Sequence, residues 1–294
     1  MVQLPPSDRH VTSTHTARRT LEGDGFEVRR AIPSDAFEAI GPFIFLDHFG
    51  PIVVKPGEAK GASAHPHAGI ETLTLLLEGS SQHKDSLGNT SIMRPGEVQW
   101  LRAGRGVIHD EAPDENLRRN GGRVHGVQLW INMPKGHKHD APSYRHVEAN
   151  EIPFLKHGGR SASLRLIAGR VGDLTGPIAT NGAPFVAHAT LAAGGDFTLD
   201  PEDVDELALY VMTGSVRVGE NRIDAGRLGR MSASGGLHVA ADVAAEVLIL
   251  GGDALDAPIL RHGPFVMNDT ADLQRALSDY HSGRMGVLPP RQVG

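Results

Sequence analysis

Two short pairs of metal-binding side chains give this sequence its clearest chemical signal. His65 and His67 are separated by one residue, and so are His109 and Glu111. Side chains two residues apart on a β-strand point to the same face of the sheet. Two neighbouring strands could therefore direct three imidazoles and one carboxylate at a single point. Such a donor set suits a divalent first-row transition metal: iron, manganese, nickel, copper or zinc. The spacing predicts a mononuclear metal site inside a β-barrel.

The composition agrees with a β-rich globular protein whose metal is held by nitrogen and oxygen atoms. The 294 residues include 36 glycines and 19 prolines, which without a collagen-like period indicate many turns. The chain has no cysteine, so disulfides, zinc–thiolate sites and thiol catalysis are excluded. A net charge of −6 argues against direct nucleic-acid binding, which needs a basic surface.

The distribution of apolar residues indicates where in the cell the protein is expected. The sequence contains no run of 18 apolar residues, so it predicts no transmembrane helix. The N-terminal residues lack the apolar core of a signal peptide. We therefore expect a cytoplasmic protein that does not bind membranes, and we expect it to be a monomer.

Short apolar runs separated by glycine-containing turns fall into two sets. They include residues 43–46, 72–77 and 124–132 in the first set, and 206–211 and 246–250 in the second. Many short strands at such spacing are typical of a barrel or sandwich, and two sets predict a duplicated barrel.

The polar, proline-containing segment 134–150 is interpreted as the connection between the two halves. We therefore predict a metal-binding domain over 1–140, a second domain over 150–262, and a tail over 263–294 that packs back on the barrels. In the tail, Leu273, Ala276 and Leu277 have helical spacing, and Thr270 is the predicted N-cap.

Longer motifs occur in both halves: DHFG at 47–50, HPHAGIET at 65–72, DSLGN at 85–89, RPGEVQW at 94–100, AGRGVIHDE at 103–111, QLWIN at 128–132, GPFVMN at 263–268 and DYHSGR at 279–284. In combination they resemble the motifs of the pirin family, which belongs to the cupins. Cupins are small β-barrels that hold a metal inside. In most cupins a single His follows the PxG turn by about three residues, whereas thirteen positions separate Gly96 from His109 here; this departure points to pirins.

The resemblance implies an all-β bicupin: two tandem cupin barrels, of the double-stranded β-helix or jelly-roll type, with a short C-terminal helix. It implies that the N-terminal barrel binds one metal, usually Fe²⁺, through His65, His67, His109 and Glu111. It also implies a C-terminal barrel without metal. The histidines at 157, 188, 238 and 262 agree with this, because none forms an HxH pair.

The identity of the carboxylate ligand is a choice between two residues. The general cupin pattern would use Glu71, whereas the pirin pattern uses Glu111. If residues 109–111 are extended, His109 and Glu111 share a face, but Glu71 lies four residues after His67 and would also face the site. We favour Glu111 as the ligand and expect Glu71 nearby, where it orients an imidazole.

The remaining histidines are expected to be structural. His137 and His139 form a second HxH pair, but they lie in the polar connecting segment and are interpreted as solvated surface. His48 is expected to make a structural hydrogen bond in a turn, and His125 to be a core histidine.

Two functions are compatible with the resemblance. The first is a metal-dependent dioxygenase of the quercetin 2,3-dioxygenase type, which opens the flavonol heterocycle and releases carbon monoxide, with Glu111 as ligand and catalytic base. The alternative is a non-catalytic, redox-sensitive iron-binding regulator that acts through protein partners. Both require the same four ligands, and no motif identifies the physiological substrate.

Overall fold

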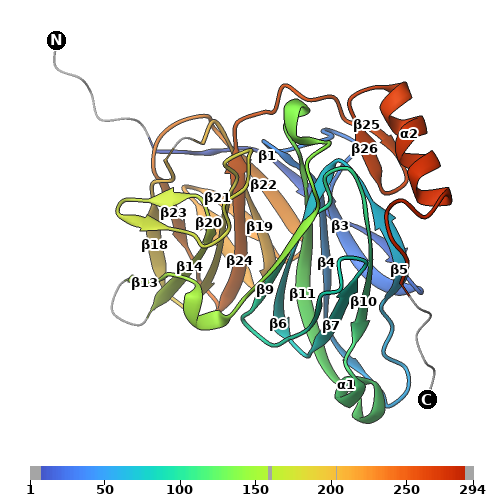
Figure 1. Cartoon of the computed structure of the whole chain (residues 1–294). Helices are drawn as coiled ribbons and strands as arrows, with labels where there is room; N and C mark the ends of the chain where they lie inside the picture. The colour runs from blue at the N-terminus through green and yellow to red at the C-terminus, as the bar shows by residue number, and fades with distance from the viewer. Residues whose placement is uncertain (1–7, 158–160, 203, 289–294) are drawn as a thin grey trace. The chain divides into compact units, whose positions relative to one another are not determined.

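The computed structural model describes residues 8–157, 161–202 and 204–288 (Figure 1). Strands account for 55% and helices for 9% of the structure, which confirms the predicted all-β class. The chain forms two compact units. Among the described residues, the first unit contains 19–29, 44–149 and 255–288. The second unit contains 8–18, 30–43, 150–157, 161–202 and 204–254.

The first unit contains a larger and a smaller sheet. The larger sheet has the strand order β12-β9-β6-β11-β4-β3-β2, and the smaller one β5-β10-β7-β8. The strands are β2 (Arg18–Glu22), β3 (Phe26–Ile32), β4 (Phe43–Val54), β5 (Ala62–His67), β6 (Ile70–Glu78), β7 (Ser81–Asp85), β8 (Thr90–Met93), β9 (Val98–Arg102), β10 (Val107–Pro113), β11 (Gly122–Asn132) and β12 (Ser143–Val147).

The second unit has a corresponding pair of sheets. Their strand orders are β1-β22-β19-β24-β17-β14-β13 and β18-β23-β20-β21. The strands are β1 (Val11–Thr16), β13 (Phe154–His157), β14 (Ala162–Ala168), β17 (Phe185–Leu191), β18 (Asp196–Leu199), β19 (Glu206–Thr213), β20 (Ser215–Val218), β21 (Asn221–Asp224), β22 (Arg227–Met231), β23 (Leu237–Ala240) and β24 (Ala245–Gly252). A separate two-stranded sheet consists of β15 (Arg170–Val171) and β16 (Leu174–Thr175).

The interior of the second unit is apolar. Phe197 and Val239 from the smaller sheet belong to the same buried cluster as Leu209, Val247 and Ile249 from the larger one. Burying such side chains is the main favourable contribution to folding. Both groups of candidate metal ligands in the described residues lie in the first unit instead.

Segments distant in sequence combine in each unit. β1 pairs with β22, and the buried Arg9 side chain donates to the carbonyl oxygens of Ser232 and Val204. The contiguous domains 1–140, 150–262 and 263–294 stay a prediction, and their outermost residues, 1–7 and 289–294, lie outside the described residues.

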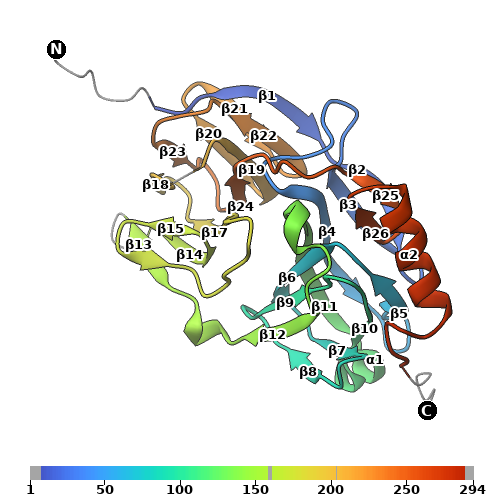
Figure 2. The same cartoon turned by 45° about the horizontal axis from the view of Figure 1, so that its top comes forward.

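The predicted helix in the tail is present as α2 (Thr270–His281), after β25 (Leu260–His262) and β26 (Phe265–Met267) (Figure 2). Its N-cap differs from the prediction: the Asp269 side chain, not that of Thr270, accepts a hydrogen bond from the backbone of Asp272. A carboxylate at this position also interacts favourably with the helix dipole. No helix in the described parts of the chain has the length and apolar character needed to cross a membrane.

Several elements were not predicted, among them three short helices and a strand within the segment interpreted as a connection. The segment interpreted as a connection contains β12, which pairs with β9, and it therefore extends the larger sheet of the first unit. The short helices are α1 (Glu115–Asn120), η1 (Lys135–His137) and η2 (Ala149–Glu151).

Lys138 joins the tail to the turn that follows β5. Its side chain is fully buried, and Nζ donates to the carbonyl oxygens of Gly69 at 3.0 Å and Val266 at 2.8 Å, and to Oδ1 of Asn132 at 2.5 Å. Burial lowers the pKa of Lys138 to about 7. Three oxygen acceptors satisfy the three hydrogens of an ammonium group, so one side chain connects three segments.

Replacing Lys138 with Met should destabilise the first unit. The Lys138→Met change keeps an unbranched chain but removes a buried donor from three acceptors. The carbonyl oxygen of Gly69 retains a hydrogen bond from the Met133 N–H at 3.3 Å, and each acceptor left unsatisfied costs about 1–3 kcal/mol. We expect a loss of about 3 kcal/mol or more in unfolding free energy, measured by urea denaturation. The matched control is Lys135→Met at an exposed position. Equal stability of the two variants would contradict this role of Lys138.

Candidate metal centre

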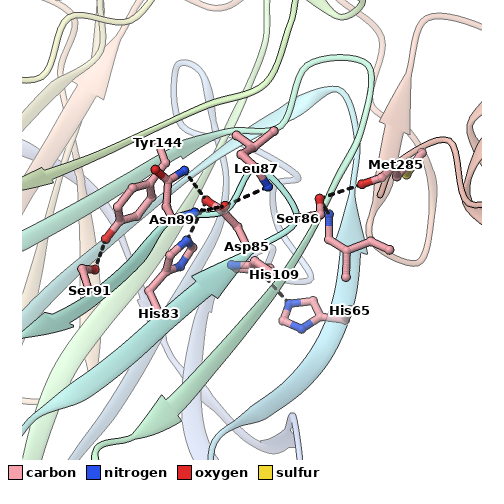
Figure 3. A network of polar contacts seen from close by, with 11 residues as sticks. His65, His83, Asp85, Ser86, Leu87, Asn89, Ser91, His109, Tyr144 and Met285 are labelled. Atoms are coloured by element: carbon pink, nitrogen blue, oxygen red, sulfur yellow. Dashed lines mark hydrogen bonds and ion pairs between the residues drawn. The ribbon is translucent and has the colours of Figure 1, made fainter. Parts of the chain in front are cut away.

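Three imidazoles meet where β5 and β10 run side by side. His65 lies directly opposite His109 in the antiparallel register, and His67 follows on the same face of β5. The Nε2 atoms of His65 and His67 are 3.1 Å apart. Those of His65 and His109 are 2.9 Å apart (Figure 3). The structure therefore brings three of the four predicted ligands together.

The hydrogen bonds behind these rings determine which nitrogen carries a lone pair. His65 Nδ1 lies 2.8 Å from the carbonyl oxygen of Ser63, and His67 Nδ1 lies 3.4 Å from that of Pro264. A carbonyl oxygen can only accept, so each Nδ1 carries hydrogen and each Nε2 of a neutral ring carries a lone pair. Two lone pairs at 3.1 Å repel each other, and a cation between them would satisfy both.

Burial keeps these rings in the form that binds a metal. His67 and His109 are 2% and 0% exposed. Burial lowers the pKa of both groups well below the usual value for histidine, and the neighbouring His65 lowers it further. Metal ions bind neutral imidazole, so the pair is ready to coordinate without first losing protons.

The spacing of the donors fits a transition-metal ion. Two nitrogen ligands at right angles, each about 2.1 Å from an ion, lie about 3 Å apart. The Nε2 separations of 2.9 and 3.1 Å agree with this geometry. His67 and His109 are buried, whereas His65 on the edge strand β5 is half-buried, so solvent reaches the centre at His65.

Glu111 lies beside this group but not within it. Its Oε2 accepts a hydrogen bond of 2.7 Å from Gln128 Nε2, and its Oε1 accepts one of 3.4 Å from Thr74. Glu111 forms a second group with His83 and His109, in which one ligand atom from each residue lies within 4.8 Å of the others. His109 therefore belongs to both groups, and Glu111 is adjacent to the three-histidine position.

His83 is the residue of this region that the sequence argument missed. It lies on β7 directly opposite Glu111 and is 1% exposed. The spacing of His83 and Asp85 repeats the two-residue period that identified the other ligands, so this signal was available.

Glu71 has partners other than those expected. It is buried on β6, where Trp100 Nε1 donates to its Oε2 at 2.9 Å and Arg102 Nε lies 3.5 Å from its Oε1. This carboxylate thus accepts a hydrogen bond from an indole and pairs with a guanidinium, whereas the prediction was that it orients an imidazole. Burial raises the pKa of Glu71 to about 7, against the lowering effect of Trp100 and Arg102.

The four histidines that were expected to be structural lie outside both groups of candidate ligands. The side chains of His137 and His139 are 47% and 45% exposed and face Asp140 and Asp272, as expected for surface residues. His48 and His125 are buried and approach each other at 2.9 Å between their Nε2 atoms. His48 lies within β4 rather than in the turn that was predicted.

Comparison with known proteins places these observations in a family. The model of the Pirin family matches residues 25–131, and that of the Pirin C-terminal cupin domain matches residues 186–286. A Pseudomonas aeruginosa protein, provisionally named a quercetin 2,3-dioxygenase, is 36% identical over 95% of this chain and 99% of its own length. Human pirin is 29% identical over 95% of both chains.

Solved structures agree with the predicted two-cupin fold. The crystal structure of a quercetin 2,3-dioxygenase from Acinetobacter baumannii superposes with a TM-score of 0.89 at 31% identity, covering 96% of this chain and all of the other. The prediction of two cupin-type domains with a short C-terminal helix is thereby confirmed.

The buried position of Glu71 predicts a specific pH dependence of stability. Its pKa is about 7 in the folded protein and 4.5 when exposed, so the folded state holds a proton more tightly. The stabilisation that comes from this tighter proton binding is fully present below pH 4.5 and is lost as the pH rises through 7. Over this range, wild type should lose about 3 kcal/mol relative to Glu71→Gln.

The measurement is urea unfolding of both proteins in chelator across this pH range. Glutamine retains an acceptor for Trp100 but does not titrate. Parallel stability curves for wild type and Glu71→Gln would show that the carboxyl is not protonated in the folded state.

Proposed function

The chain belongs to the pirin family, and on that premise we propose that it is a metal-dependent dioxygenase of the quercetin 2,3-dioxygenase type. The proposed substrate is a phenol or flavonol. The proposed cofactor is one Fe²⁺ held by His65, His67, His109 and Glu111, with manganese, nickel, copper and zinc as alternatives. The convergence of three Nε2 atoms is the observation that carries this proposal.

The similar proteins support the type of reaction. The P. aeruginosa relative and the A. baumannii structure both bear the name quercetin 2,3-dioxygenase, and both match the chain over nearly its whole length. A related fold alone would not identify a reaction, but here the relatives and the arrangement of donors point to the same chemistry.

The side chains around the centre have distinct roles in this proposal. A bound metal supplies Lewis acidity toward a hydroxyl group and redox chemistry toward dioxygen. Glu111 accepts the hydroxyl proton of the substrate at a carboxylate oxygen, while Gln128 and Thr74 fix the orientation of that carboxylate. The substrate approaches from the half-buried side at His65.

The second candidate, a redox-sensitive regulator that acts through protein partners, uses the same ligands. Turnover separates the two functions, because a regulator can bind a chelating phenol but forms no cleaved product. Monomeric state and cytoplasmic location remain predictions.

Replacing Glu111 with Gln should abolish turnover. The Glu111→Gln change keeps the size of the side chain but removes the charge and the basic oxygen, and general-base catalysis contributes about 10²- to 10⁴-fold. The assay supplies quercetin and air to the iron-loaded protein and measures oxygen consumption and carbon monoxide. Glu71→Gln is the control and should retain most activity.

Two outcomes would contradict the proposal in different ways. A flavonol that changes the absorption spectrum of the iron-loaded wild type without giving product would favour the regulator. Loss of turnover in Glu71→Gln but not in Glu111→Gln would show that the roles of the two carboxylates are reversed.

A further inference from the structure

His83 pairs with a carboxylate, as the histidines that bind metals in proteins usually do. Its Nε2 lies 3.1 Å from Oδ2 of Asp85, and a carboxylate that accepts from one ring nitrogen leaves the other free to bind a metal (Figure 3). The His83 ring also stacks on Tyr144, with ring centroids 4.1 Å apart and an angle of 7° between the planes. Its position and orientation are therefore fixed from two sides.

Asp85 is in turn fixed by the loop that follows β7. Its Oδ1 accepts hydrogen bonds from the backbone N–H groups of Leu87 at 2.9 Å and Asn89 at 3.0 Å. Its Oδ2 accepts from the side chain of Asn89 at 2.8 Å as well as from His83. A carboxylate can only accept at these positions, so Nε2 of His83 carries hydrogen and the lone pair of the neutral ring is on Nδ1.

His83 also lies beside two of the proposed metal ligands, His109 and Glu111. A ring nitrogen of His83, one of His109 and a carboxylate oxygen of Glu111 lie within 4.8 Å of one another. The register explains this, because β10 lies between β5 and β7 and places Glu111 opposite His83 and His109 opposite His65. Two proposed ligands thus face His83 from the neighbouring strand.

We infer that His83 is a further metal-binding residue of this centre and presents its Nδ1 beside His109 and Glu111. The inference rests on the metal centre of the proposed function but not on the reaction. It gives the centre a fourth imidazole and assigns Asp85 a defined task, which is to keep hydrogen on Nε2 and the lone pair on Nδ1.

The test counts imidazole rings bound to the metal. The whole protein is loaded with Cu²⁺, and pulsed electron paramagnetic resonance counts the coupled imidazoles. Wild type should show four and His83→Gln three, with Zn²⁺ affinity by calorimetry weakened about 10-fold or more. The matched control is His146→Gln, because His146 also pairs with a carboxylate, Glu97, but belongs to neither group of candidate ligands.

A second variant tests the tautomer without removing the ring. In Asp85→Asn, the two backbone N–H groups should hold the amide oxygen at the Oδ1 position, so the NH₂ group faces Nε2 of His83. Nε2 must then accept, hydrogen moves to Nδ1, and the lone pair for the metal is lost. We expect one imidazole fewer and Zn²⁺ affinity about 10- to 100-fold weaker.

The outcomes separate this inference from the proposed function. If wild type shows three imidazoles and neither His83→Gln nor Asp85→Asn changes the number or the affinity, His83 is not a ligand although the metal centre stands. If wild type binds neither Cu²⁺ nor Zn²⁺ through imidazole, both the inference and the proposed metal centre are wrong.

Discussion

The close approach of neutral imidazoles inside the first unit is the constraint on which the rest of this site depends. The Nε2 atoms of His67 and His109 lie 3.1 and 2.9 Å from that of His65, and the rings of His67 and His109 are buried, where protonation is disfavoured. Without a cation, the lone pairs of His65 and His67 face each other. The protein must therefore hold the rings rigidly from behind, and backbone carbonyl groups of Ser63 and Pro264 do so.

This constraint gives the C-terminal tail a role within the first unit. The carbonyl group of Pro264 orients His67, and the backbone next to it pairs with Ala68. Lys138 connects the same two segments. A corresponding pair of sheets in the second unit encloses an apolar cluster. The first unit also buries apolar side chains such as Leu73 and Leu129, but it adds the group of metal-binding donors.

The sequence predicted most where a local period carried the information. The two-residue spacing placed His65, His67 and His109 on neighbouring strands, and helical spacing located α2. Prediction from the sequence failed where contacts between residues far apart in the chain determine the structure. Residues 143–147 look like a polar connection but form β12 because β9 offers an edge, and Lys138 is buried between two exposed histidines because three distant oxygen atoms accept its hydrogens. The partners of Glu71 were likewise invisible, since Trp100 and Arg102 come from another strand.

Anomalous diffraction from crystals of the metal-loaded protein tests the central claim most directly. Data collected on both sides of the absorption edge of the loaded metal locate the ion independently of any assumed ligand. The account predicts a peak about 2.1 Å from Nε2 of His65, His67 and His109. A peak at the exposed pair His137 and His139 instead, or none at the three-histidine position in protein shown to contain metal, would contradict it.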